Sequence, residues 1–142
     1  MKEILKGNIQ IIEKIDDWKE AVRISAQPIL KKQYIQSSYI ESAIQNIEEL
    51  GPYIILIDGV AIPHSRPEEG VFSTSSSLLI IKNGVSFSPK TEDVKLIFLL
   101  AAKDNSDHMD LLKRLSGLLL DNEQLLDQLL LCSSSEEVLK LL

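Results

Sequence analysis

The amino-acid sequence predicts an α/β fold, in which helices flank a mixed sheet. Two observations support this fold class. Apolar residues recur at helical spacing near both ends of the chain, and the central part changes to short β-branched and apolar runs. With 142 residues, 44% hydrophobic and 25% charged, the chain has an ordinary globular composition, and we expect residues 1–142 to form one domain.

Two helices are expected in the first part of the chain. The first begins near Asp17, which fits a capping box with Glu20, and Pro28 is expected to kink or end it. The second begins at Ser38, and its apolar residues follow the i, i+3, i+4, i+7 rule. The pair Gly51–Pro52 is expected to end this second helix.

Short extended segments follow in the centre of the chain. Asn83-Gly84 lies between two of them and predicts a tight hairpin turn, because both turn positions need a positive φ. The last segment is nearly all apolar, as in a buried strand. The expected strands are residues 53–57, 60–62, 77–81, 85–87 and 94–100.

The remaining third of the chain is expected to be helical. Ser106 offers an N-cap for a third helix, Asp107 is favourable at its positive end, and a stripe of leucines follows. Two shorter helical segments are expected at residues 123–131 and 136–141. Cys132 lies in a Leu-rich stretch and is expected in the core.

Composition argues against several classes of function. A formal net charge of −6 disfavours binding to the phosphates of nucleic acid. A single cysteine excludes an internal disulfide, and without a Cys/His cluster we expect no structural zinc. The sequence has no Gly-rich nucleotide loop and no acidic metal-binding cluster, so we expect no cofactor.

The N-terminal stretch gives no sign of export. Acidic residues occur throughout its first 20 residues, unlike a signal or transit peptide. The longest apolar run, Leu96–Ala102, is too short to cross a bilayer. We therefore expect the protein in the cytoplasm.

His64, one of only two histidines, follows a short predicted strand. Pro63 restricts the backbone before it, and Pro67 and Gly70 restrict and turn the segment after it. We expect an imidazole held at a strand end by a stiff loop. Arg66 lies two residues on, on the same side of an extended segment, where it would bind an anion carried by His64.

The second histidine, His108, lies near the predicted start of the third helix, where free N–H groups attract anions. If strands 60–62 and 94–100 are neighbours, the two histidines meet at one edge of the sheet. A neutral imidazole is a good nucleophile, and phosphoryl transfer needs mainly positioning and charge stabilisation. In the absence of an ATP-binding loop, another phosphoprotein is the expected phosphoryl donor.

Each of these residues also has a simpler interpretation. A histidine beside prolines is often a polar loop residue, and His108 fits an ordinary first-turn position of a helix. Arg66 fits a surface charge near Glu68 and Glu69. The spacing alone leaves these alternatives open.

A longer stretch of sequence narrows these alternative interpretations. Residues 51–71, GPYIILIDGVAIPHSRPEEGV, resemble the active-site segment of the IIA components of the bacterial phosphoenolpyruvate-dependent sugar phosphotransferase system, mannitol/fructose type. The Gly-Pro-Tyr stretch and the Pro-His-x-Arg-Pro-Glu pattern look most like the ascorbate-like branch. The resemblance extends over nearly the whole chain, including IEELGP at 47–52 and AAKDNSDH at 101–108. It implies a mixed five-stranded sheet flanked by helices.

The resemblance also implies roles for individual residues. His64 matches the phosphorylated histidine, which takes its phosphoryl group from phospho-HPr and passes it to a cysteine of the IIB component, the link to the membrane transporter IIC. His108 matches the second active-site histidine, which assists the transfer. Mannitol-type members carry an arginine sixteen residues before the phosphorylated histidine. Glu48 stands there in this chain, and Arg66 is the candidate for the missing positive charge.

Two other functions stay open. One is a regulatory IIA-like module that signals its phosphorylation state to a transcription regulator or kinase. The other is a degenerate structural domain, against which the intact histidine pair argues. Neither the sugar nor the oligomeric state follows from the sequence. For transient docking of partners, we expect an apolar ring around His64 that includes Ile62, Phe72 and Phe87.

Overall fold

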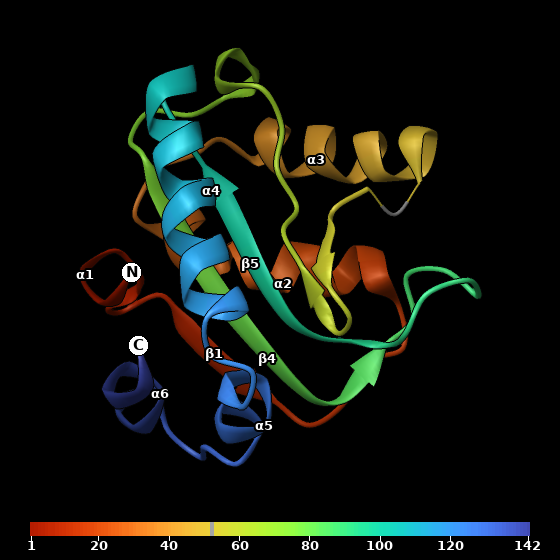
Figure 1. The fold of residues 1–142 in the computed structure, drawn as a ribbon. Helices are drawn as coiled ribbons and strands as arrows, with labels where there is room; N and C mark the ends of the chain where they lie inside the picture. The colour runs from red at the N-terminus through yellow and green to blue at the C-terminus, as the bar shows by residue number, and fades with distance from the viewer. Residues whose placement is uncertain (52) are drawn as a thin grey trace.

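A mixed five-stranded sheet with the strand order β1-β4-β5-β3-β2 forms the centre of the molecule (Figure 1). The computed structural model describes residues 1–51 and 53–142. Strands β1 and β4 are parallel, as are β3 and β5, whereas β4 runs antiparallel to β5 and β2 antiparallel to β3. The strands are β1 (Ile9–Ile12), β2 (Ile55–Ile57), β3 (Val60–Ala61), β4 (Ser75–Val85) and β5 (Val94–Ala101).

Helices cover both faces of this sheet, so the predicted fold class is confirmed. Helices α2 and α3 pack on one face, while α4, α5 and α6 pack on the other. The helices are α1 (Lys2–Leu5), α2 (Trp18–Lys31), α3 (Ser37–Leu50), α4 (Asn105–Leu120), α5 (Leu125–Leu130) and α6 (Ser135–Leu141), with a short 3-10 helix, η1, at Pro67–Glu69.

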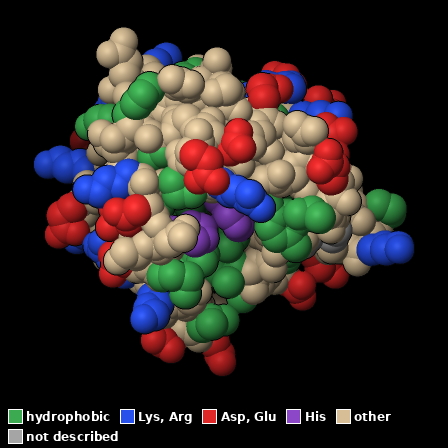
Figure 2. All heavy atoms as spheres, turned by 90° about the horizontal axis from the view of Figure 1, so that it is seen from above, with side chains coloured by type: hydrophobic (Ala, Val, Ile, Leu, Met, Phe, Trp, Pro, Cys, Tyr) green, Lys and Arg blue, Asp and Glu red, His purple; other side chains and the backbone are tan. Residues whose placement is uncertain are grey.

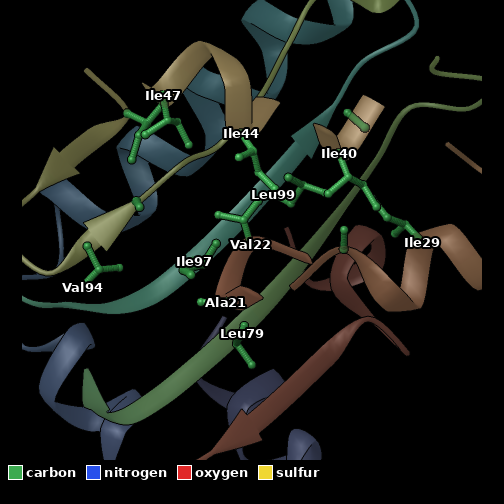
Figure 3. Packing of buried hydrophobic residues seen from close by; sticks show 14 of the residues in the cluster. Ala21, Val22, Ile29, Ile40, Ile44, Ile47, Leu79, Val94, Ile97 and Leu99 are labelled. Carbon is green, nitrogen blue, oxygen red and sulfur yellow. The ribbon is translucent and has the colours of Figure 1, made fainter. Parts of the chain in front are cut away.

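The two central strands divide their side chains between two cores. In a strand, successive side chains point to opposite faces. Accordingly, Leu79, Ile97 and Leu99 join the α2/α3 core shown in Figure 3, whereas Phe98 and Leu100 join the core beneath α4. Cys132 is 4% exposed in this second core, as expected. The nearly all-apolar composition of β5 therefore reflects burial on both faces.

Helix α2 begins as predicted but does not end at its proline. Asp17 caps it by accepting a hydrogen bond from the Lys19 N–H, whereas Glu20 of the predicted capping box pairs with Arg23 instead. The helix continues through Pro28 to Lys31. Proline lacks the N–H that would donate to the carbonyl of Ile24, four residues earlier. The side-chain amide of Gln10, in β1, donates to that carbonyl over 2.6 Å instead. A neighbouring strand thus supplies the hydrogen bond that the proline removes.

The starts of α3 and α4 differ slightly from the predicted ones. Helix α3 begins at Ser37, and the Ser38 hydroxyl contacts Gln36 and the carbonyl of Glu69 instead of capping the helix. Gly51, with φ of 81°, ends α3, while the rest of the predicted Gly51–Pro52 stop lies outside the described residues. The N-cap of α4 is Asp104, not Ser106, since the Asp104 carboxylate accepts the Asp107 N–H.

The hairpin predicted at Asn83-Gly84 is wrong. Strand β4 continues through both residues to Val85, and only Gly84 has a positive φ. The register against β5 shifts between Ile80 and Val85, so the irregular segment is a bulge within one strand. The true hairpin joins β4 to β5 through residues 86–93. Strand β1 was not predicted, although it completes the count of five.

Candidate functional site

The two histidines meet at one edge of the sheet, as the sequence predicts. Strands β3 and β5 are parallel neighbours, with Val60 paired to Leu96, so their carboxyl ends lie at the same edge. His64 follows β3, and His108 lies in the first turns of α4, which begins soon after β5. Their ring centroids are 5.0 Å apart, with 45° between the ring planes.

The His64 ring is held in one orientation by its own backbone. Its Nδ1 lies 2.7 Å from the carbonyl oxygen of Ile62. A carbonyl oxygen only accepts, so this contact selects the tautomer with a proton on Nδ1. The lone pair then resides on Nε2. The half-exposed ring of Tyr53 meets His64 edge-on, with centroids 5.7 Å apart.

His108 is positioned by the first turn of α4. The hydroxyl of Thr74, just before β4, donates to the Asp107 carboxylate over 2.6 Å, and it accepts the Lys103 N–H at 3.0 Å. The sheet is therefore tied to the start of the helix. Burial, and secondarily the charge of a protonated His64, lowers the pKa of His108 below its ordinary value of 6.5. His108 is thus predominantly neutral at pH 7.

A hollow of about 250 Å³ opens above the pair. Figure 2 looks down on this edge and shows both histidines side by side, with hydrophobic side chains close by. Asn46, Tyr53 and Asn105 also line it, and none of them is among the predicted site residues. The full lining is Asn46, Tyr53, His64, Ser65, Arg66, Pro67, Asn105 and His108.

Charge in the hollow comes from Arg66. Among residues 1–51 and 53–142 it forms no ion pair within 4 Å. Its side chain is exposed, which also agrees with the simpler interpretation as a surface charge near Glu68 and Glu69. Glu48 instead pairs with Lys19 of α2, at 3.1 Å, and is not part of the lining. The residue that α3 presents to the hollow is therefore the neutral amide Asn46.

The expected apolar ring around His64 is only partly present. Phe72 is 60% exposed and available to a partner. Ile62 is buried in the core beneath α4, and Phe87 packs against Trp18 with ring centroids 5.3 Å apart. Burial therefore removes Ile62 from the ring, and packing against Trp18 removes the half-buried Phe87 from it.

Two classes of site or segment are missing from the described part of the chain. Within it, no three His, Cys, Asp or Glu side chains cluster closely enough to hold a metal ion. None of its helices has the length and apolarity needed to span a bilayer.

Comparisons with known proteins agree with this geometry. The family described as phosphoenolpyruvate-dependent sugar phosphotransferase system, EIIA 2, matches residues 3–142. The chain is 38% identical to the mannitol-specific cryptic phosphotransferase enzyme IIA component of Escherichia coli, over 94% of this chain and 90% of that protein. It is 30% identical to the ascorbate-specific EIIA component of the same species, over 95% and 88% respectively.

Solved structures of enzyme IIA components are similar to this chain as well. A solution structure of the mannitol-specific cryptic enzyme IIA from Escherichia coli superposes with a TM-score of 0.88 at 36% identity, covering 98% of this chain and 95% of that one. A complex of enzyme IIA for mannitol with phosphorylated enzyme IIB, also from Escherichia coli, matches with a TM-score of 0.82 at 26% identity, covering 95% and 93%.

Proposed function

Since this chain belongs to the EIIA 2 family of the phosphoenolpyruvate-dependent sugar phosphotransferase system, we propose that residues 1–142 act as one cytoplasmic IIA phosphocarrier unit. His64 accepts a phosphoryl group from phospho-HPr and passes it to a cysteine of a cognate IIB component. IIB in turn serves a membrane transporter, IIC, that couples sugar uptake to phosphorylation. The ascorbate-specific and mannitol-specific relatives favour an ascorbate-like or polyol cargo.

The single observation that carries the proposal is the contact between Nδ1 of His64 and the carbonyl oxygen of Ile62. With Nδ1–H donated to the Ile62 carbonyl, Nε2 has a free lone pair. In the first step Nε2 forms a bond to phosphorus while the P–N bond of phospho-HPr breaks, and HPr leaves with a neutral imidazole. The positive charge that develops on the His64 ring is stabilised by the same carbonyl.

In the second step, the bond between His64 and phosphorus breaks. A cysteine thiolate of IIB forms a bond to phosphorus, the N–P bond of His64 breaks, and its electron pair returns to Nε2. The transferring group carries negative charge throughout, and Arg66, which also lines the hollow, is the cation that stabilises it. His108, neutral and adjacent, assists by hydrogen bonding to a phosphoryl oxygen.

The test is phosphorylation with labelled phosphoenolpyruvate, enzyme I and HPr, followed by addition of IIB. We expect wild-type protein to carry an acid-labile label, as a phosphohistidine does, and to transfer it to IIB. His64→Ala should take up no label. His108→Ala should still be labelled on His64 but should transfer roughly 100-fold more slowly.

Each arm has an outcome that counts against the proposal. Label on His64→Ala would overturn the site, and an acid-stable, base-labile label would point to Ser65 or Ser73. An unchanged transfer rate in His108→Ala would remove the second histidine from the mechanism. Label on His64 that never reaches any IIB component would favour a regulatory module.

A further inference from the structure

One polar face of α3 contacts the residue that follows His64. Tyr39, Ser42 and Asn46 are spaced by three and four positions, so they share one side of the helix. All three side chains hydrogen-bond to Ser65. The other buried side chains of α3 are apolar, including Ile40, Ala43, Ile44 and Ile47.

These contacts hold both the backbone and the side chain of Ser65. The Ser65 N–H donates to the Tyr39 hydroxyl oxygen over 3.0 Å. The Ser65 hydroxyl lies 2.6 Å from that of Ser42 and accepts from the Asn46 amide at 3.2 Å. The N–H of Ser65 belongs to the peptide group that leaves His64, so fixing it limits rotation of the His64 backbone.

The Tyr39 hydroxyl also reaches β5. It donates to the carbonyl oxygen of Leu100 over 2.6 Å. The Leu100 N–H in turn donates to the Pro63 carbonyl at 3.1 Å, and that carbonyl belongs to the peptide group that enters His64. Both peptide groups beside His64 are therefore tied to Leu100, one directly and the other through Tyr39.

We infer that Tyr39 is a positioning residue for phosphoryl transfer: its hydroxyl bridges the His64–Ser65 peptide to Leu100 and thereby fixes His64 relative to His108. The inference rests on the proposed function for its kinetic consequence but not for its structural one. Strand β5 leads directly into the loop that carries α4, so Leu100 and His108 belong to one continuous support.

The environment of the hydroxyl suits this task. Tyr39 is 1% exposed, and burial raises the pKa of Tyr39 to about 12. The phenol therefore stays protonated and remains a donor at physiological pH. Removing it would leave the Ser65 N–H and the Leu100 carbonyl without this partner, and the loop would gain freedom at the residue that must present Nε2.

The test compares Tyr39→Phe with wild type by two readouts. In phosphotransfer from phospho-HPr, we expect kcat to fall roughly 10- to 100-fold with KM within about twofold, because misplacement affects the chemical step more than docking. In ¹⁵N NMR of the unphosphorylated protein, the His64 ring should change from the Nδ1–H form to a mixture of tautomers. If Tyr39 had a purely structural role, Tyr39→Phe would lower the melting temperature but leave His64 in the Nδ1–H form.

Tyr34→Phe is the matched control, since Tyr34 is 37% exposed and its hydroxyl has no hydrogen bond among the described residues. It should match wild type in both readouts. An unchanged kcat together with an unchanged tautomer in folded Tyr39→Phe would overturn the inference. The NMR measurement of the His64 tautomer needs no phosphoryl donor. It therefore tests the positioning role of Tyr39 even if the wild-type protein takes up no phosphoryl label.

A measurement on wild-type protein decides the matter if Tyr39→Phe does not fold. The Ser65 amide should exchange slowly with deuterated solvent, because it donates to a buried phenol. Exchange at the rate of an unstructured chain would show that the bridge does not form in solution and would overturn the inference.

Discussion

The interior of β5 and the loops at its carboxyl end differ sharply in composition, although only a few residues separate them. In the interior, Leu96 to Leu100 are fully buried and alternate between the two cores. At the end, His64 and His108 are only partly buried and face a hollow whose lining residues are mostly of polar types. The comparison teaches that one strand supplies stability along its length and supports the two histidines where it stops.

The largest expected effect comes from the interior. Phe98 is fully buried beneath α4, so Phe98→Ala leaves a cavity and should lower the free energy of unfolding by about 3–5 kcal/mol. The rate of phosphoryl uptake per folded molecule should stay within about twofold of wild type. A twofold change in rate corresponds to less than about 1 kcal/mol in the activation free energy. Urea denaturation and labelling under folding conditions measure the two quantities.

Leu131→Ala is the control, because Leu131 is 83% exposed and its loss should change stability by no more than about 0.5 kcal/mol. A Phe98→Ala protein that is fully folded but inactive would contradict the division of roles between the strand interior and its carboxyl end, since the interior would then take part in the chemistry.

A smaller effect is expected at the edge, from Arg66. Arg66→Ala should slow transfer from phospho-HPr roughly tenfold by removing a cation from the hollow, an effect below that of losing a donor in a fully buried site. The stability should remain within about 0.5 kcal/mol, since Arg66 is exposed. Stopped-flow transfer and a thermal melt provide the readouts.

The uncharged control is Arg66→Met, which keeps an extended aliphatic side chain without the charge and should be as slow as the alanine variant. Full activity in both variants would show that Arg66 is only a surface charge.

The smallest effect is the titration of His108. Burial and the charge of His64 both lower the pKa of His108 from 6.5, burial being the larger cause. In His64→Ala, the pKa of His108 should therefore rise but remain below 6.5. NMR titration of the ring protons of both proteins measures the change. A His108 pKa above 6.5 in wild type would contradict the burial seen at this edge.

The same shift has a consequence for stability. The folded protein binds a proton at His108 less readily than the unfolded chain does, so the free energy of unfolding should decline as pH falls from 6.5 towards the folded-state pKa and level off below it. The decline should be absent from His108→Gln.

The sequence predicted the meeting of the two histidines better than the strands that hold them. His64, His108 and Arg66 are candidates because prolines, a helix start and a charge stand out locally, and all three line one hollow. Strand β1 was missed because its four partly buried residues lie among acidic and polar neighbours and gain their strand partner, β4, from residues almost 70 positions away. Its pairing is a tertiary effect that local spacing does not contain.

Other differences have equally specific causes. Asn83-Gly84 favours a turn, but pairing of Val85 with Val94 keeps β4 extended through a bulge. Pro28 favours a helix end, but Gln10 replaces the lost hydrogen bond. Tyr39 lies beside an apolar helical stripe, and its spacing alone does not distinguish it from a core residue. Its polar companions at the third and seventh positions beyond it, Ser42 and Asn46, were the available signal that this side of α3 meets something other than apolar packing.

The direct hydrogen bond between Pro63 and Leu100 has a dynamic consequence. Both the loop after β3 and the segment leading to α4 are attached to the end of β5, so we expect thermal bending of the sheet to move them together. We therefore expect the separation between the two imidazoles to change less under such bending than it would if the two segments were attached to different strands.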